Sequence, residues 1–485
     1  MTDEIPTSTK FPSRSRRGVL LGLTASQLTV TVITGGILLA TLMTKGIVGA
    51  VELTPLWALA AAIVVIRYHG RSAADWAPIA IRYWLRRTKG QLIWLARPST
   101  RPRRTGLLHL PGTAASLRAV SSPDGNIGAI HDPKTGTLTA VTRVSSRAFA
   151  LLDPATQANN VQGWGRTLAA LSRSGHVARI QVLERTVPDS GDSLQRYWAE
   201  HGRPDAHVAG PIYQDLLAAA GPAAAPHEAY IAIALDLKAA RRLINQAGGG
   251  LSGAFAVLAQ TTSSLDQSAR GAGLVPGGWL TAEQIAATIR TAYDPKALAG
   301  LTRWSDSGHP QTGTAAAGPV VLVEAPTRLR TDTAHHAVFW VEQWPRTETH
   351  FGFLHQVMFT AGVRRTLSLT YDPQTLEAAL RDVQRQKATI VADAAERARK
   401  GQVESEADGQ EYADAKVRER QLIAGHSDVD LTGLIVVSAD TAEELHSVTA
   451  SIETAAVNAG IDLRLLELQQ AEAFTTGALP LARTL

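Results

Sequence analysis

Two long apolar runs near the start of the chain dominate its hydrophobic pattern. Gly18–Met43 holds no charged residue over 26 residues, more than the roughly 20 that a helix needs to cross the hydrocarbon core of a bilayer. Gly46–Ile66 follows at once and contains one charged residue, Glu52. The pattern predicts a hairpin of two transmembrane helices within residues 18–68, followed by a long and mostly polar body.

Cations flank both runs on the same predicted side. Arg14, Arg16 and Arg17 precede the first run, and Arg67 and Arg71 follow the second. An excess of Lys and Arg beside a span marks the cytoplasmic side. We therefore expect a multi-pass protein of the plasma membrane with both termini in the cytoplasm, residues 1–17 forming a basic tail. A cleaved signal peptide is the rival interpretation, but its apolar core is only 7–15 residues long.

The first run carries a row of polar residues at helical spacing. The row is expected to be the face that meets a partner helix, and it consists of Gln27, Thr31, Thr34 and Thr41. Membrane helices recognise one another through small residues and hydrogen bonds between helices. The partner is either the second helix of the same hairpin or another subunit, so assembly into an oligomer is expected.

A basic, tryptophan-rich segment follows the second run, within residues 69–106. The stretch Ala73–Leu95 predicts an amphipathic helix that suits the membrane surface, and a linker follows it. The residues expected at the lipid surface are Trp76, Arg82, Arg86, Arg87 and Lys89. The alternative is an ordinary helix packed on the soluble body.

Beyond residue 106 the pattern switches to strands alternating with helices, which indicates a mixed α/β body and an overall α+β fold class. Asp153–Arg173 predicts a helix that starts at an aspartate cap, and Val177–Glu184 predicts a strand. A polar segment at 303–318 is the expected linker between a first subdomain, 107–302, and a second, 319–485. In the second, the stretch from Pro373 to about Gly425 predicts a long helix or a helical hairpin.

Charge divides the chain at the same place as hydropathy. Residues 1–106 carry 15 Lys and Arg against 4 Asp and Glu, whereas residues 107–485 carry 33 against 39. The basic character therefore lies beside the membrane, where cations gain energy from anionic lipid head groups. A net negative body argues against direct nucleic-acid binding, which needs clustered cations. Cysteine is absent, which excludes disulfides and thiolate chemistry.

No motif for catalysis, cofactor binding or metal binding is convincing. A phosphate loop of the form GxxxxGK[ST] is missing. Gly248–Gly253 matches GxGxxG, but a predicted helix and not a strand precedes it. The histidines at 335, 336, 350 and 355 lack a ligand set, and Asp306, Ser307 and His309 crowd one loop. We expect no enzyme activity, no cofactor and no metal.

Several stretches resemble two families of conjugation machinery. The two spans and ADWAPIAIRYWLRR resemble the small PrgI-type membrane subunit of type IV secretion systems. The body resembles the non-catalytic N-terminal domain of the VirB-type secretion ATPase. The stretches that carry this second resemblance are IGAIHDPKTGTLTAVTRV, LDLKAARRLI, the long helix after Tyr371-Asp372-Pro373, and the ending with Leu466–Gln470, Glu472, Phe474 and Leu479–Leu481.

The resemblance implies a fusion of a membrane subunit with an ATPase docking domain, as in actinobacterial conjugation-like membrane proteins. In the ATPase family a similar ending leads into the motor domain, whereas this chain stops at Leu485. The implied partners are a separate P-loop ATPase and other channel subunits. The implied function is a non-enzymatic membrane scaffold for secretion or conjugation. Open alternatives are an EccE-like subunit of a type VII system and a membrane-bound enzyme with an unrecognised site.

Overall fold

The computed structural model of the protein describes most of its 485 residues. The described residues are 8–9, 25–68, 71–96, 106–146, 149–187, 192–203, 209–220, 226–298, 300–301, 313–345, 349–360, 362–399, 406–423 and 428–485. The chain divides into two compact units, one formed by residues 13–93 with 467–469 and the other by the remainder. The expected 303–318 linker falls largely outside the described residues, and the division at that point stays a prediction.

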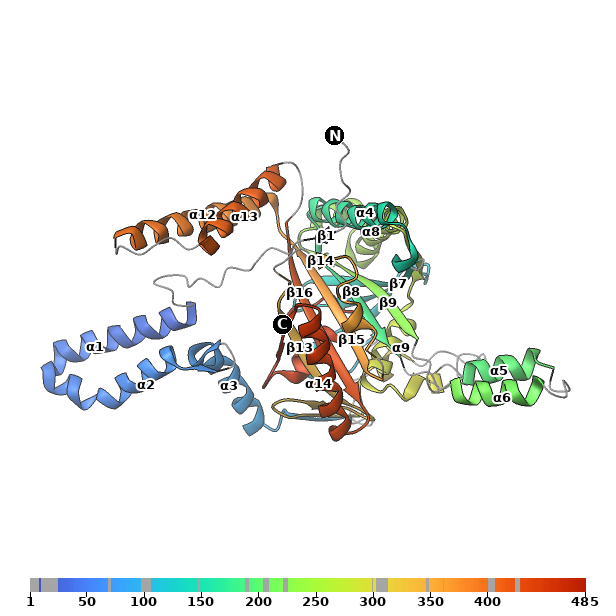
Figure 1. Ribbon diagram of the computed structural model, residues 1–485, viewed down its shortest axis with the longest axis horizontal. Coiled ribbons are helices and arrows are strands. Elements are labelled where there is room, and N and C mark those ends of the chain that lie inside the picture. Colours follow the sequence, from blue (N-terminus) through green and yellow to red (C-terminus); the bar gives the residue numbers. More distant parts are fainter. Residues whose placement is uncertain are drawn as a thin grey trace. The chain divides into compact units, whose positions relative to one another are not determined.

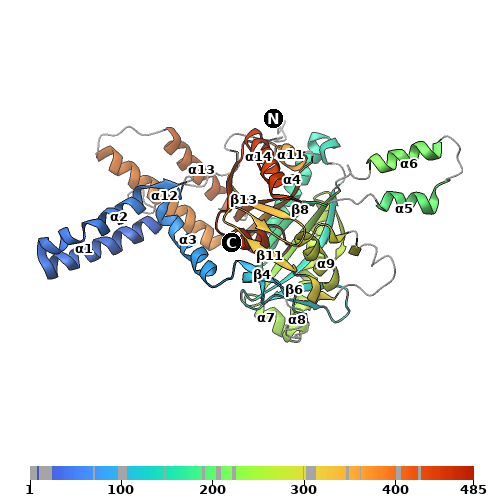
Figure 2. The ribbon, with the colours of Figure 1, turned by 90° about the horizontal axis from the view of Figure 1, so that it is seen from below.

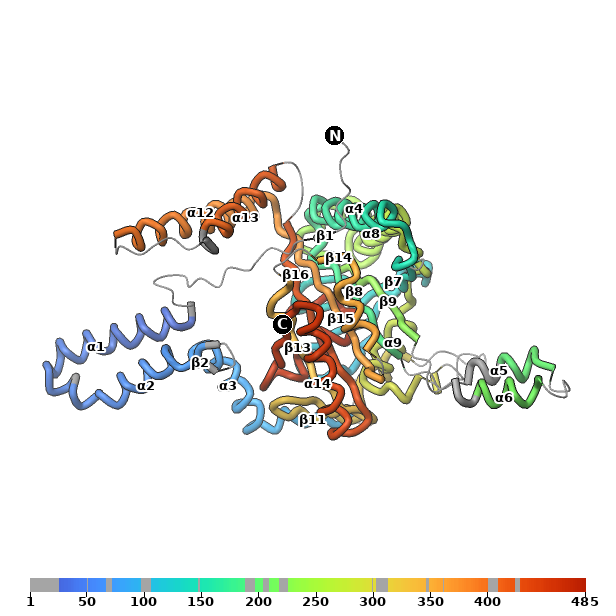
Figure 3. The backbone as a smooth tube through the Cα atoms, viewed as in Figure 1, coloured from blue at the N-terminus to red at the C-terminus, as the bar shows by residue number. Residues whose placement is uncertain are grey.

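The described part of the smaller unit contains three helices, which are coloured blue in Figures 1 and 3. They are α1 (Ala25–Glu52), α2 (Thr54–Val65) and α3 (Ala73–Thr88), with the short strands β2 (Arg67–Tyr68) and β3 (Arg71–Ser72) between the last two. Helices α1 and α2 lie side by side. Ser72 caps α3, since its hydroxyl accepts a hydrogen bond from the Asp75 backbone amide at 3.3 Å, which satisfies an otherwise free donor of the first turn.

The larger unit is built on one large sheet whose first and second halves have a similar order of elements, with two helices before the last strand of the first half and one before that of the second. The first half runs β5 (Arg118–Ser121), β6 (Gly128–Asp132), β7 (Thr137–Ser146), α4 (Pro154–Arg173), β8 (Val177–Thr186), α5 (Asp192–His201), α6 (Ala209–Ala220), β9 (His227–Asp236), α7 (Arg241–Gln246), α8 (Gly250–Gly271), β10 (Leu274–Trp279) and α9 (Ala282–Tyr293). The second runs β11 (Val321–Glu324), β12 (Leu329–Arg330), β13 (His335–Gln343), α11 (His355–Met358), β15 (Arg364–Pro373), α12 (Leu376–Arg399), α13 (Glu406–Ile423), β16 (Val429–Ala439), α14 (Ala442–Asn458), β17 (Asp462–Leu465) and α15 (Gln470–Gly477).

Strand pairing repeats as well. In the first half β7 pairs with β6, β9 and β10, and β9 pairs with β8. In the second half β13 pairs with β12, β16 and β17, and β16 pairs with β15. All these pairings are antiparallel. The equivalent strands β8 and β15 then pair antiparallel with each other and join the halves. The larger unit is therefore a topological repeat with a local twofold at this joint.

The remaining strands lie at the margins of this arrangement. The 13 strands of the sheet follow the order β4-β11-β12-β13-β16-β15-β8-β9-β7-β6-β5, with β10 and β17 as branches. The strand β4 (Ile93–Leu95) begins where the two units divide. A separate small sheet pairs β1 (Ser8–Thr9) with β14 (Thr349–His350).

Alternation along the strands divides the core between the two faces of the sheet. In β9, Tyr230, Ala232 and Ala234 point to one face, where α9 and α15 pack. Ile231, Ile233 and Leu235 point to the other, which α4, α7 and α8 cover. The second half repeats this division, with α11 and α14 on the same face as α4 and α8. Successive side chains of a strand point to opposite faces of the sheet, so a strand buried on both faces places alternate residues in two separate cores.

The C-terminal segment is part of the core. Leu479 and Leu481 are buried. Gln181, fully buried in β8, donates to the Leu479 carbonyl at 3.1 Å and accepts from the Ala482 amide at 2.7 Å. One side chain thus ties the chain's ending to the centre of the sheet, at the joint between the halves.

Two pairs of helices, α5–α6 and α12–α13, occupy the same place in the repeat: the first lies between β8 and β9 in the chain, and the second lies between β15 and β16. Both pairs are labelled in Figure 2. The predicted long helix or helical hairpin after Pro373 corresponds to two helices, α12 and α13, and residues 400–405 between them lie outside the described residues. The α12–α13 pair has a small core of Ala379, Val383 and Leu422. We call these two pairs the arms.

Candidate functional site

Helix α1 is the one described helix that is long and apolar enough to cross a membrane. Its apolar part, Ser26–Gly49, has 24 residues, and within it an 18-residue window has a mean hydropathy of 1.6 with only 6% of the window buried. A soluble protein normally covers a helix of this kind with its own chain, whereas Met43 and Ile47 are 79% and 76% exposed. An apolar helix near an N-terminus is also typical of a signal sequence.

The predicted second span, residues 46–66, is not one continuous helix. Gly46 has φ 64° and ψ −157°, so the helical path breaks there, inside α1. A second break at Leu53 precedes α2, which starts with a proline in its first turn and has 12 residues. At 1.5 Å per residue this is about 18 Å, short of the roughly 30 Å hydrocarbon core. Hydropathy alone does not reveal these breaks, because Gly46 and Leu53 are uncharged and leave the apolar run in the sequence uninterrupted.

The predicted partner face of α1 divides into one residue that reaches a second helix and three that do not. Gln27 is buried, and its amide donates to the Val64 carbonyl of α2 at 2.8 Å. The hydroxyls of Thr31, Thr34 and Thr41 donate to carbonyls four residues earlier in α1 itself. Gln27 therefore fits the interpretation in which the face meets the neighbouring helix of the same chain.

The predicted lipid-surface residues lie on α3 and just after it. Arg82, Arg87 and Lys89 are exposed, whereas Trp76 and Arg86 are half-buried. The exposed aromatic ring is Trp84, and the Arg87 guanidinium carbon lies 4.9 Å from its centroid. Helix α3 ends at Thr88, earlier than the predicted Leu95.

The other sequence candidates do not form sites. Gly248–Gly250 is the turn between α7 and α8, with positive φ at all three glycines, as expected for a glycine turn. Among the described residues no group of three or more potential metal ligands exists. The trio at 306–309 lies outside the described residues.

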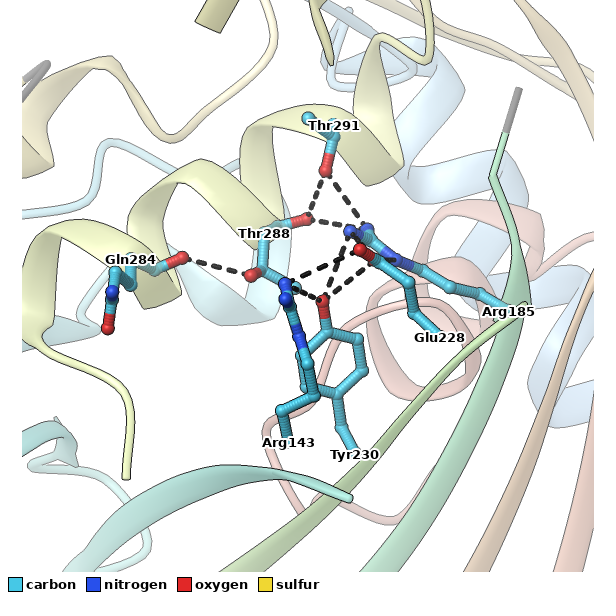
Figure 4. Close-up of polar contacts among 7 residues, drawn as sticks. All are labelled: Arg143, Arg185, Glu228, Tyr230, Gln284, Thr288 and Thr291. Carbon is cyan, nitrogen blue, oxygen red and sulfur yellow. Dashed lines mark hydrogen bonds and ion pairs between the residues drawn. The ribbon is translucent and has the colours of Figure 1, made fainter. Parts of the chain in front are cut away.

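A buried polar cluster that the sequence did not reveal lies between α9 and the ends of β7, β8 and β9 (Figure 4). Arg185, 7% exposed, donates from Nε and Nη2 to Glu228 Oε2 at 2.9 and 2.7 Å. Its Nη1 donates to the Thr288 carbonyl and to the Thr291 hydroxyl at 3.1 and 3.0 Å. The Tyr230 hydroxyl donates to Glu228 at 2.8 Å. The guanidinium is thus satisfied from both the sheet and α9.

Charge in this cluster is arranged around one carboxylate. Burial would raise the pKa of Glu228, but Arg185, Tyr230 and Arg143 outweigh burial and hold that pKa below its ordinary value. Arg143, whose side chain is 55% exposed, lies 3.4 Å from the other carboxylate oxygen. The alternation of residues along β8 and β9 could have revealed this cluster, because it places Arg185 and Glu228 on the same buried face of the sheet as Leu183 and Tyr230.

A second buried network centres on His336. The Thr331 hydroxyl donates to the Tyr293 carbonyl at 2.6 Å, so its oxygen accepts from His336 Nε2–H at 2.8 Å. His336 Nδ1 then accepts from the Ser438 hydroxyl at 2.8 Å. Burial, with help from Arg364, lowers the pKa of His336 to about 3. A general base works best when its pKa lies near the pH of the reaction. The pKa of His336 is too low for that role, so we interpret the hydrogen bonds from Thr331 through His336 to Ser438 as structural.

Ser438 and Arg185 line a common cavity on this face of the sheet. Its volume is about 30 Å³, and Thr291, Thr366 and Phe474 also line it. Organic ligands occupy pockets of roughly 300–1,000 Å³, so this space suits ordered water. The two networks are therefore interpreted as supports of the larger unit.

Comparison with known proteins found no match: no family model fits the chain, and no curated protein resembles it significantly.

Proposed function

We propose that this chain is a non-enzymatic membrane scaffold that holds its larger unit at the cytoplasmic face of the plasma membrane. The observation that supports this most is α1, an apolar helix of spanning length whose surface is exposed. The larger unit, in contrast, has its own buried core. A helix left uncovered beside a self-sufficient core is typical of a membrane anchor.

The proposal includes two passes. The continuation of α1 after the break at Gly46, together with α2, returns through the bilayer beside the first pass. Gln27 joins the two passes, since its amide donates to the Val64 carbonyl at 2.8 Å, and hydrogen bonds between helices are one of the contacts that hold membrane helices together. The Arg residues before and after the passes keep both termini in the cytoplasm.

The proposal also names the machine, a type IV secretion or conjugation-like channel with a separate P-loop ATPase as docking partner. This part rests on the resemblance of the sequence. The arms fit such a role, because exposed apolar residues on them offer contact area to a partner. They include Ile212 and Leu216 on α6, at 64% and 58% exposure, and Val391 on α12 and Val417 on α13, at 56% and 41%. Arms at equivalent places of a repeat suit two equivalent sites on that partner.

A detergent pull-down of the full chain tests the docking function, with mass spectrometry of the recovered proteins and an ATPase assay. We expect a P-loop ATPase whose activity disappears when its own phosphate loop is mutated. The double variants Ile212→Ser/Leu216→Ser and Val391→Ser/Val417→Ser should each reduce recovery, and Thr389→Ser is the matched control. A chain recovered alone, with its own turnover or a bound cofactor, would contradict the proposal and favour a membrane-bound enzyme.

A further inference from the structure

Helix α3 exposes a continuous apolar ridge along one side. Ile81, Trp84 and Leu85 are 60%, 57% and 55% exposed. At 100° per residue these three positions fall on one face of the helix. Tyr83 lies on the opposite face and is 5% exposed. The helix is therefore covered on the side of Tyr83 and leaves the other side uncovered.

Cations border this ridge on both sides. Lys89 and Arg82 follow Leu85 around the helix, and Arg87 lies next to Trp84, with its guanidinium carbon 4.9 Å from the ring centroid. The single acid of the helix, Asp75, is at its other end, hydrogen-bonded to the hydroxyls of Ser26 and Ser72. An apolar ridge with cations along both borders matches an anionic lipid surface, where rings and aliphatic chains enter and cations meet phosphates.

The start of α3 coincides with one end of the two apolar helices. The Ser26–Asp75 hydrogen bond joins the first turn of α1 to the first turn of α3. Gln27 binds Val64 near the end of α2, at the same level. Polar side chains of this kind gather where an apolar helix pair meets the interface. The helix thus leaves from the level at which a membrane surface would lie.

We propose that α3 lies in the surface of the anionic cytoplasmic leaflet, with Ile81, Trp84 and Leu85 inserted and Arg87 and Lys89 on lipid phosphates. The proposal rests on the proposed anchoring function and adds its lipid partner. It also changes the expected aromatic contact from Trp76, which is half-buried, to Trp84. The competing interpretation is that this ridge of α3 binds a groove with acidic walls on another protein.

The absence of cysteine from the chain makes the test clean, because one introduced cysteine is the sole labelling site. Trp84→Cys, Met43→Cys and Ala388→Cys are each labelled with an environment-sensitive fluorophore in the full chain. Each protein is reconstituted into vesicles of phosphatidylcholine alone or of an equimolar mixture with phosphatidylglycerol. Spin-labelled lipids and aqueous iodide then quench the fluorophore. Met43 in α1 reports the span, and Ala388, exposed on α12, reports water.

We expect the label at position 84 to be quenched by a shallow lipid spin label in the phosphatidylglycerol vesicles and protected from iodide. Adding Arg87→Gln or Lys89→Gln to Trp84→Cys should lower the ratio of lipid-bound to free α3 about fivefold each. These exposed residues contribute nothing to the core, so folding is preserved.

The three labels distinguish a failure of this inference from a failure of the anchor. If the label at 43 is in lipid but the label at 84 behaves like that at 388, this inference fails and the anchor stands. If the label at 43 is also in water, the anchor itself fails. Protection at 84 that is the same in both kinds of vesicle would overturn the anionic-lipid assignment and favour a protein contact.

Discussion

The Arg185–Glu228 pair gives the sharpest prediction about stability. Arg185 is 7% exposed. When Glu228 is replaced by Gln, the Arg185 guanidinium keeps its two hydrogen-bond partners on α9 but loses its countercharge. Removing one member of a buried pair costs about 3–5 kcal/mol, because the other charge stays desolvated. Arg143→Met is the matched control. Arg143 contacts the same carboxylate from a side chain that is 55% exposed, so we expect less than about 1 kcal/mol.

The expected shift in melting temperature follows from the size of the larger unit. Unfolding entropy is about 2.1 cal/mol/K per residue, or about 0.8 kcal/mol/K for the roughly 400 residues of the larger unit. A loss of about 3–5 kcal/mol therefore lowers Tm by about 4–6 °C for Glu228→Gln, and a loss below about 1 kcal/mol lowers it by less than about 1 °C for Arg143→Met. Tryptophan fluorescence during heating of the detergent-solubilised full chain measures both.

Two further measurements test whether the buried ion pair is the cause of the lost stability. The double variant Arg185→Met/Glu228→Leu should recover most of the lost Tm, since apolar replacements of a buried pair are often neutral. The folded pKa of Glu228 lies below its ordinary value, so its contribution is present above the unfolded pKa and is lost as pH falls through the folded one. Below about pH 4.5, the decrease in Tm with falling pH should therefore be smaller for Glu228→Gln than for the unaltered chain. A Tm shift for Glu228→Gln no larger than that for Arg143→Met would refute the explanation.

The remaining predictions concern His336, a close glycine contact and the helix pair. The folded pKa of His336 is about 3 against an ordinary 6.5, so stability should fall by about 1.4 kcal/mol per pH unit as pH drops below 6.5. His336→Asn should remove that slope, and a Tm of the unaltered chain that stays constant between pH 7 and 5 would contradict the effect of burial. A Cβ on Gly128 would lie 2.1 Å from the Ala282 amide nitrogen at the start of α9, so Gly128→Ala should destabilise by several kcal/mol. Gly165→Ala in α4 meets open space and should stabilise by about 0.5–1 kcal/mol; equal Tm values for the two would be inconsistent with the close contact. Gln27→Leu removes the bond to Val64 and should cost about 0.6 kcal/mol in a bilayer, measured as increased susceptibility of the α1–α2 pair to unfolding in mixed detergent.

Local elements of the fold were predictable because local chemistry defines them. Asp153 caps α4 as expected, with its carboxylate accepting from the Thr156 amide at 2.9 Å. The predicted strand from Val177 is β8, and the residues after Thr281 form α9, which starts with a capping box at that residue. Caps and alternation act over a few residues, so the sequence displays them directly.

What the sequence did not reveal depends on distant pairings. The joint between β8 and β15 brings residues 180–185 beside 366–371, and no local pattern specifies that register. The Arg185 cluster draws on four elements, so its members look like ordinary inward positions until the sheet and α9 are assembled. The break at Gly46 was hidden for another reason, since an apolar count carries no information on backbone dihedral angles.

Anchoring of the intact chain in a membrane by α1 is the central claim, and alkaline carbonate extraction of cell membranes tests it most directly. Intact-mass analysis of the extracted protein accompanies the test, and Leu38→Arg/Leu39→Arg is the comparison, at about 2.5–3.5 kcal/mol of insertion free energy for each charge. We expect the unaltered chain to stay in the membrane pellet with residues before α1 still attached, and the charged variant to be released. Recovery of the unaltered chain in the supernatant, or of a membrane-free product cleaved after α1, would contradict the claim.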